Sequence, residues 1–132
     1  MALCPCGRLA GASKPLTLEQ CCGRFISDFE KAPAPDAESL MRSRYSAFVL
    51  ERADYLLATW HASRRPATIA FDAGVKWLGL ELRQHRVSDT THAAVEFVAR
   101  QKSPGSRAVR LHERSRFVRE EGRWYYVDGD QL

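Results

Sequence analysis

All four cysteines of this 132-residue chain lie near its N-terminus, in two close pairs. The first pair is Cys4 and Cys6 in the stretch CPCG, and the second is Cys21 and Cys22 in the stretch QCCG. A segment of about 20 residues cannot bury a hydrophobic core of its own, so sulfur chemistry must constrain its fold. The cysteines therefore form disulfides, carry out redox chemistry or bind a metal ion.

The N-terminal stretch MALCPCGRLAGASK lacks the apolar run of a signal peptide. No other stretch approaches the roughly 20 apolar residues of a membrane helix. We therefore expect a cytoplasmic protein without a membrane partner. Because the cytoplasm is reducing, clustered cysteines there more often hold a metal or do redox chemistry than form structural disulfides. The net charge of +4 favours acidic partners only weakly.

Metal binding is the interpretation that the two cysteine pairs favour. Together they offer four soft thiolates, the number that closes a tetrahedral structural zinc site and leaves no open position for catalysis. Gly7 and Gly23 directly follow the two pairs, and glycine permits tight backbone turns around one ion. Redox chemistry and disulfides remain alternatives, because the neighbouring cations Arg8, Lys14 and Arg24 would stabilise thiolates in a zinc site and in a redox site alike.

Two prolines indicate a boundary within the chain. Pro33 and Pro35, in the stretch KAPAPDA, form a short stiff hinge that disfavours helix. We therefore expect a zinc-binding module with its hinge at residues 1–32. A second domain is expected at residues 33–132.

The sequence after this hinge predicts two helices. Apolar residues recur at helical spacing, Asp36 is suited to be the N-cap, and Glu38 places negative charge in the first turn. We expect one helix from Asp36 to about Leu50. A break near ERAD then separates it from a short helix that ends near Trp60.

Four later segments alternate in the manner of β-strands. Turn-forming clusters of hairpin length (SDTT, KSPGS and EEG) separate them. Two helices followed by an antiparallel meander predict an α+β domain. The segments are KWLGLELRQHRV, HAAVEFVARQ, RAVRLHERSRFVRE and RWYYVDG.

Glu113 and Ser115 interrupt an otherwise apolar face of the third strand segment. Burial would raise the pKa of Glu113 and suit it to proton transfer. An ion pair with Arg42 or Arg44 is the favoured alternative, because buried carboxylates usually have partners.

The opposite face of that segment carries several arginines. A row of arginines on a sheet can follow a phosphate backbone. However, Glu96, Glu120 and Glu121 are available to neutralise these arginines across neighbouring strands. Cross-strand ion pairing is the simpler interpretation, so contact with nucleic acid is disfavoured.

Several motifs together resemble a known family. CPCG with the later CCG is similar to the SEC-C motif, a short zinc-binding module also found at the C-terminus of the SecA translocation motor. The stretches LMRSRYSAFV, ADYLLATWH and RFVREEGRWYYVDG resemble the YchJ-like family of small bacterial proteins, whose body is a cone-shaped nuclear transport factor 2-like domain. The resemblance covers nearly the whole chain. The connector between the cysteine pairs is longer than is usual for the motif, with Arg8 where serine is common.

The resemblance implies both a cofactor and a pocket. It assigns one structural Zn²⁺ per chain to Cys4, Cys6, Cys21 and Cys22. It also implies helices packed on a curved antiparallel sheet, with a pocket between them. The candidate pocket residues are Tyr45, Trp60, His61, Trp77, Glu113 and Ser115.

Two functions follow as expectations. The favoured one is a non-enzymatic protein-interaction or adaptor protein, with a partner in the export or translation machinery by analogy with SecA. The alternative is a small enzyme or ligand-binding protein, with Glu113 as acid or base and Trp60, Trp77 and His61 shaping the pocket. Cones of this type are also compatible with a homodimer formed through an exposed sheet face.

Overall fold

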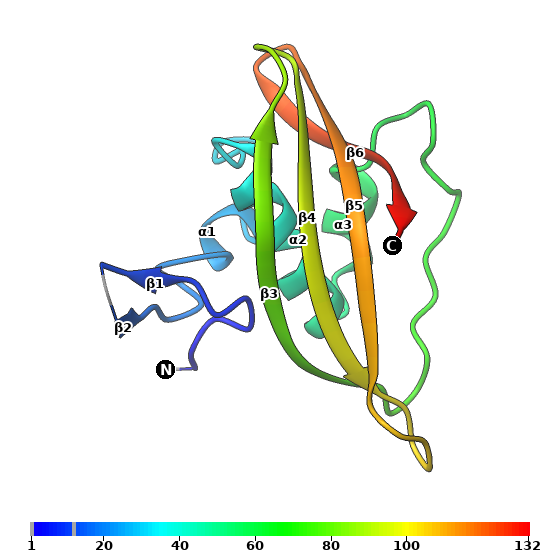
Figure 1. Ribbon diagram of the computed structural model, residues 1–132. Helices are drawn as coiled ribbons and strands as arrows, with labels where there is room; N and C mark the ends of the chain where they lie inside the picture. Colours follow the sequence, from blue (N-terminus) through cyan, green and yellow to red (C-terminus); the bar gives the residue numbers. More distant parts are fainter. Residues whose placement is uncertain (1, 12) are drawn as a thin grey trace.

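Figure 1 shows the computed structural model, which describes residues 2–11 and 13–132. Small elements come first: β1 (Leu9–Ala10), β2 (Lys14–Pro15) and α1 (Gly23–Ile26). Two longer helices follow, α2 (Ala37–Val49) and α3 (Ala53–Ala58). The chain ends in four long strands: β3 (Lys76–Val87), β4 (His92–Lys102), β5 (Val109–Glu120) and β6 (Arg123–Gln131).

The four long strands form one antiparallel sheet in the order β3-β4-β5-β6. The register is interrupted within β3 and again between β5 and β6, near Phe117. Such bulges bend a strand and increase the local twist of a sheet. Helices α2 and α3 lie against one face of this sheet (Figure 1). The predicted α+β class and the antiparallel meander are confirmed.

Helix α2 begins where the sequence predicts. Asp36 has extended backbone angles, and its Oδ1 accepts a hydrogen bond from the backbone N–H of Ser39 at 2.7 Å. Glu38 lies in the first turn, where the helix dipole favours its charge. At the other end, Glu51 takes a left-handed φ of 56°, which separates α2 from α3. The predicted N-cap and the predicted break are both confirmed.

A single core joins the N-terminal segment to the helices and the sheet. The four cysteines belong to the same cluster of buried residues as Leu40 and Tyr45 of α2, Leu56 of α3, and Val95 and Phe117 of the sheet. The N-terminal segment therefore obtains its burial from its contact with α2. Among residues 2–11 and 13–132, no helix has the length and apolar character needed to cross a membrane.

Two arginines on the basic face of β5 form ion pairs across strands, whereas Arg110 lies opposite Arg100 of β4. Arg114 lies 3.3 Å from Glu96 on β4, and Arg116 contacts both Asp128 and Asp130 on β6 at 2.6 Å. The cross-strand pairing that the sequence favours is therefore confirmed for Arg114 and Arg116, while Glu120 contacts His61 instead of an arginine. The acidic partners differ in part from those expected, because β6 supplies aspartates directly opposite β5.

Replacing Asp36 with alanine removes the acceptor for the Ser39 N–H. We expect the free energy of unfolding to fall by about 1 kcal/mol. Urea denaturation followed by far-ultraviolet circular dichroism measures this change. Asp36→Asn keeps a side-chain acceptor and should retain most of the stability. Equal losses in the two variants would contradict the capping role.

Candidate metal centre and adjoining cavity

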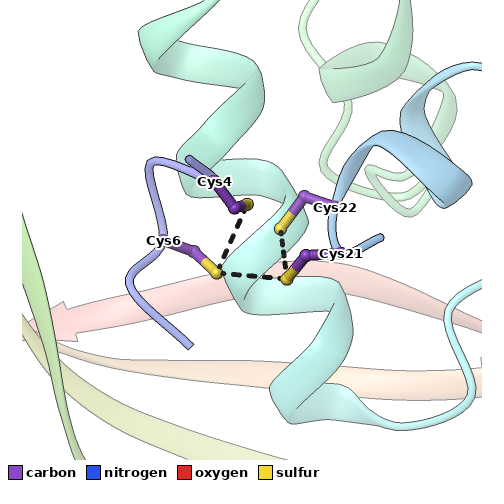
Figure 2. A group of neighbouring side chains, drawn as sticks. All are labelled: Cys4, Cys6, Cys21 and Cys22. Atoms are coloured by element: carbon purple, nitrogen blue, oxygen red, sulfur yellow. Dashed lines mark hydrogen bonds between the residues drawn. The ribbon is translucent and has the colours of Figure 1, made fainter. Parts of the chain in front are cut away.

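The four cysteine side chains converge beside α2 (Figure 2). All four sulfur atoms lie within 4.8 Å of one another. The Sγ atoms of Cys4 and Cys6 are 3.6 Å apart, those of Cys6 and Cys21 are 3.6 Å apart, and those of Cys21 and Cys22 are 4.0 Å apart. Four Zn–S bonds of about 2.3 Å require sulfur–sulfur distances of about 3.8 Å, whereas a disulfide requires about 2.0 Å. The sulfur geometry therefore fits a tetrahedral metal ion.

Burial opposes ionisation of the cysteines at this cluster. All four side chains are buried, with no more than 6% exposed. Desolvation raises the pKa of Cys21 to about 12, and hydrogen bonding to Cys4 raises the pKa of Cys22. Hydrogen bonds from Cys22 and Cys6 instead lower the pKa of Cys4. Four thiolates cannot share this space without a cation, and a divalent metal ion would supply the missing charge.

Glycine follows each cysteine pair for a different physical reason. Gly7 has a left-handed φ of 74° and donates its N–H to the carbonyl oxygen of Cys4 at 3.3 Å. Gly23 donates its N–H to the carbonyl oxygen of Leu18 at 2.7 Å, and a β-carbon at position 23 would lie 2.6 Å from that oxygen. The second glycine is therefore required by close approach of two backbone segments.

Polar contacts fasten the cysteine segment to α2. Ser46 Oγ lies 3.5 Å from Cys4 Sγ. Arg42 donates through Nη1 to the carbonyl oxygen of Cys6 at 3.1 Å, and through Nε to Glu38 at 2.9 Å. Arg42 thus joins the first cysteine loop to the first turn of the helix.

Two of the three cations expected near the cysteines also make contacts there. Arg8 donates to Ser39 Oγ at 2.9 Å, and Arg24 donates to the carbonyl oxygen of Cys21 at 3.0 Å. Lys14 is exposed on β2. The positive charge around the cluster therefore comes from arginines of the module and from Arg42 of α2.

A cavity of about 330 Å³ lies between α2 and the sheet. Helix α2 and strands β3 to β6 contribute to its lining. His61 is not among the lining residues, because its Nε2 contacts Glu120 Oε2 at 2.6 Å and its Nδ1 contacts Ser63 Oγ at 2.7 Å. The remaining five candidate pocket residues all line the cavity: Tyr45, Trp60, Trp77, Glu113 and Ser115.

The ion pair expected for Glu113 is not formed. Its Oε2 accepts from Ser115 Oγ at 2.5 Å, and its Oε1 accepts from Gln131 Nε2 at 2.8 Å. Neutral donors therefore hold the carboxylate, while Arg42 pairs with Glu38. The carboxylate also lies over Gly129, where a β-carbon would be 2.6 Å from its Oε2.

Arg44 is a buried cation in the cavity lining, with 6% of the residue exposed. Its Nη1 donates to the carbonyl oxygen of Leu56 at 2.8 Å and to Thr59 Oγ1 at 2.7 Å. Its guanidinium carbon lies 5.1 Å from the centre of the Trp60 ring and 4.6 Å from that of Tyr126. Burial lowers the pKa of Arg44 to about 10, so the side chain remains charged at neutral pH.

Sequence reasoning missed several of the lining residues. Phe97 and Leu111 could have been assigned from the alternation of their strands, since each occupies an inward position. Gln131 can be assigned to the lining only once the strand register is known, because that register places it opposite Glu113. From the sequence, Arg44 is predicted only as an alternative ion-pair partner of Glu113, and its helical spacing to Met41 could have placed it in the lining.

The comparisons with known proteins all point to the same family. Residues 36–129 match the family model described as "YchJ, middle NTF2-like domain". A UPF0225 protein from Polaromonas sp. is 78% identical over 127 residues, covering 96% of this chain and 91% of that protein. A UPF0225 protein from Methylibium petroleiphilum is 60% identical over 128 residues, covering 96% of this chain and 87% of that protein.

Two solved structures share the fold. The solution structure of a SEC-C motif containing protein from Rhodopseudomonas palustris has a TM-score of 0.79 and 31% identity, and the match covers 100% of this chain and 99% of that chain. The crystal structure of a SEC-C motif containing protein from Psychrobacter arcticus has a TM-score of 0.78 and 33% identity, covering 96% of this chain and 80% of that chain. The likeness therefore includes the cysteine segment as well as the sheet.

Replacing Gly23 with alanine would force its new β-carbon against the Leu18 carbonyl oxygen. We expect the turn that carries the second cysteine pair to shift, with a loss of roughly 1–3 kcal/mol in the free energy of unfolding. Thermal unfolding measures the loss. Glu19→Ala, at an exposed position of the same loop, should change stability by less than about 0.5 kcal/mol. An unchanged Gly23→Ala protein would show that the close approach is unimportant.

Proposed function

The chain belongs to the YchJ-like family, and on this basis we propose that it is a small protein-interaction or adaptor protein held together by one structural zinc ion. In this proposal Cys4, Cys6, Cys21 and Cys22 are the four ligands. The observation that carries it is the convergence of four buried sulfur atoms at distances that suit tetrahedral zinc. The SEC-C motif of the two structural relatives supports the same assignment.

The proposed role of the metal is structural. Tetrahedral sites of four sulfurs suit zinc or an iron–sulfur centre. Four protein ligands fill the zinc shell and leave no position for water or substrate. Zinc binding would then hold residues 1–32 against α2 and supply much of the folding free energy of this short segment.

The module offers apolar side chains to a protein partner. Leu3 and Leu9 are 61% and 48% exposed, although both belong to backbone held by β-pairing with the Lys14–Thr17 stretch. Apolar side chains on a fixed backbone suit the core of a protein interface, because little ordering is needed on binding. By analogy with the similar module of SecA, we expect the partner to belong to the export or translation machinery.

Metal analysis of the purified protein tests the zinc site. We expect about one zinc per chain by mass spectrometry, and four thiols that react with a thiol reagent only after a chelator is added. Ser106→Cys, which adds an exposed thiol between β4 and β5, should react at once and serves as the control. Metal-free protein with freely reactive thiols, or iron in place of zinc, would refute the assignment.

Substitution of an exposed leucine tests the interaction surface. Leu9→Ser should lower recovery of a specific crosslinked protein partner from bacterial cells by roughly tenfold, which corresponds to a loss of about 1.4 kcal/mol of binding free energy. Leu78→Ser removes a leucine of similar exposure from β3 and should leave recovery unchanged. A partner retained by Leu9→Ser, or lost equally from both variants, would contradict a role for the module surface.

A further inference from the structure

Arg44 is a buried charge with no carboxylate in direct contact, although the charge of Glu113 across the same cavity helps to keep it protonated. Among residues 2–11 and 13–132, no carboxylate oxygen lies within 4.0 Å of its guanidinium nitrogens. Arginines are almost never fully buried unless they are paired, because removing the charge from water is costly. The contacts to Trp60 and Tyr126 offset part of this cost but supply no negative charge.

One edge of the Arg44 guanidinium remains available for a ligand. The two hydrogens of Nη1 go to Leu56 and Thr59, on and beside α3. Nε and Nη2 have no hydrogen-bond partner in the part of the chain that the structure describes. These two nitrogens present parallel N–H groups on the edge away from Nη1, an arrangement that matches the two oxygens of a carboxylate. Arg44 lines the cavity, and its unpartnered Nε and Nη2 are not among the fully buried atoms of the described residues, so a carboxylate in the cavity can reach this edge.

The cavity has the size and the walls for one aromatic ring with a short side chain. Its volume of about 330 Å³ is roughly twice the ~150 Å³ of an apolar cavity that binds benzene. Trp77 already packs edge-to-face against Tyr45, with ring centres 5.6 Å apart, and Phe97 and Leu111 complete the apolar lining. Aromatic walls of this kind favour an aromatic guest.

Glu113 restricts the charge that a ligand can carry. Its carboxylate lines the same cavity and is held by Ser115 and Gln131 rather than by Arg44. A ligand carboxylate on Arg44 gains an ion pair that offsets its repulsion from Glu113, whereas a second carboxylate would meet that repulsion with no further cation among the lining residues. The cavity therefore favours a monocarboxylate over a diacid.

We propose that this cavity binds a small aromatic monocarboxylate, with the carboxylate on the Nε and Nη2 edge of Arg44 and the ring against Trp77 and Phe97. The site is separate from the cysteine cluster and does not depend on the adaptor proposal. Arg44 binds the ligand carboxylate, and Glu113 repels a second carboxylate on the same ligand.

Isothermal titration calorimetry of the full chain with matched compounds tests the proposal. The probes are 3-phenylpropionate and its uncharged amide, 3-phenylpropanamide. We expect the acid to bind at least about tenfold more tightly, as for hydrogen bonds to a charged group. Arg44→Met should remove this preference, whereas Arg119→Met, which removes an exposed arginine outside the cavity lining, should keep it. Equal affinities for the two compounds, no saturable binding at millimolar concentration, or a preference that survives Arg44→Met would overturn the proposal.

Two further measurements use protein in which Arg44 is intact, so they test the proposal even if the Arg44→Met variant does not fold. Phenylsuccinate, a diacid, should bind at least about tenfold more weakly than 3-phenylpropionate, and Glu113→Gln should narrow this difference. Bound 3-phenylpropionate should shift the indole N–H signals of Trp60 and Trp77, which line the cavity, but not that of Trp124. Equal affinities for phenylsuccinate and 3-phenylpropionate, or signal shifts confined to Trp124, would also overturn the proposal.

Discussion

Helix α2 is buried on several sides although much of its surface is polar, and the rest of the structure depends on how those polar groups are satisfied. Ser39 accepts from Arg8 of the cysteine segment, and Ser43 contacts the hydroxyl of Tyr55 on α3 at 2.7 Å. Ser46 reaches Cys4. Buried hydroxyls without partners would cost roughly 1–3 kcal/mol each, so these contacts fix which elements can surround the helix.

This arrangement places the two candidate sites around a single helix. The cysteine cluster meets α2 at Ser46 and Arg42, whereas the cavity meets it at Arg44 and Tyr45. Neighbouring residues of one helical turn thus serve both sites. Helix α2 needs polar residues because it contacts both sites. A uniformly apolar helix could pack against the sheet, but it could not form hydrogen bonds with the cysteine loops or place a charged group in the cavity.

Local sequence signals predicted most of the fold, and contacts between distant residues account for what they missed. Alternation located the four strands, and Asp36 marked the start of α2, because both signals act over a few residues. The two cysteine pairs predicted a single metal site mainly from the number of ligands, and the structure brings the four sulfur atoms together. The partners of Glu113 could not be predicted in the same way. They depend on the β5–β6 register, which places Gln131 opposite Glu113. They also depend on the hydrogen bond from Arg44 to the carbonyl oxygen of Leu56 in α3, which holds this arginine away from the carboxylate.

Gly129 lies against the Glu113 carboxylate, although it is not one of the residues that line the cavity. With no side chain at this position, the Glu113 carboxylate can rest on the β6 backbone. A β-carbon at this position would displace the Glu113 carboxylate from the β6 backbone, and the charge inside the cavity would move with it. The position of the cavity's carboxylate therefore depends on a residue that does not itself line the cavity.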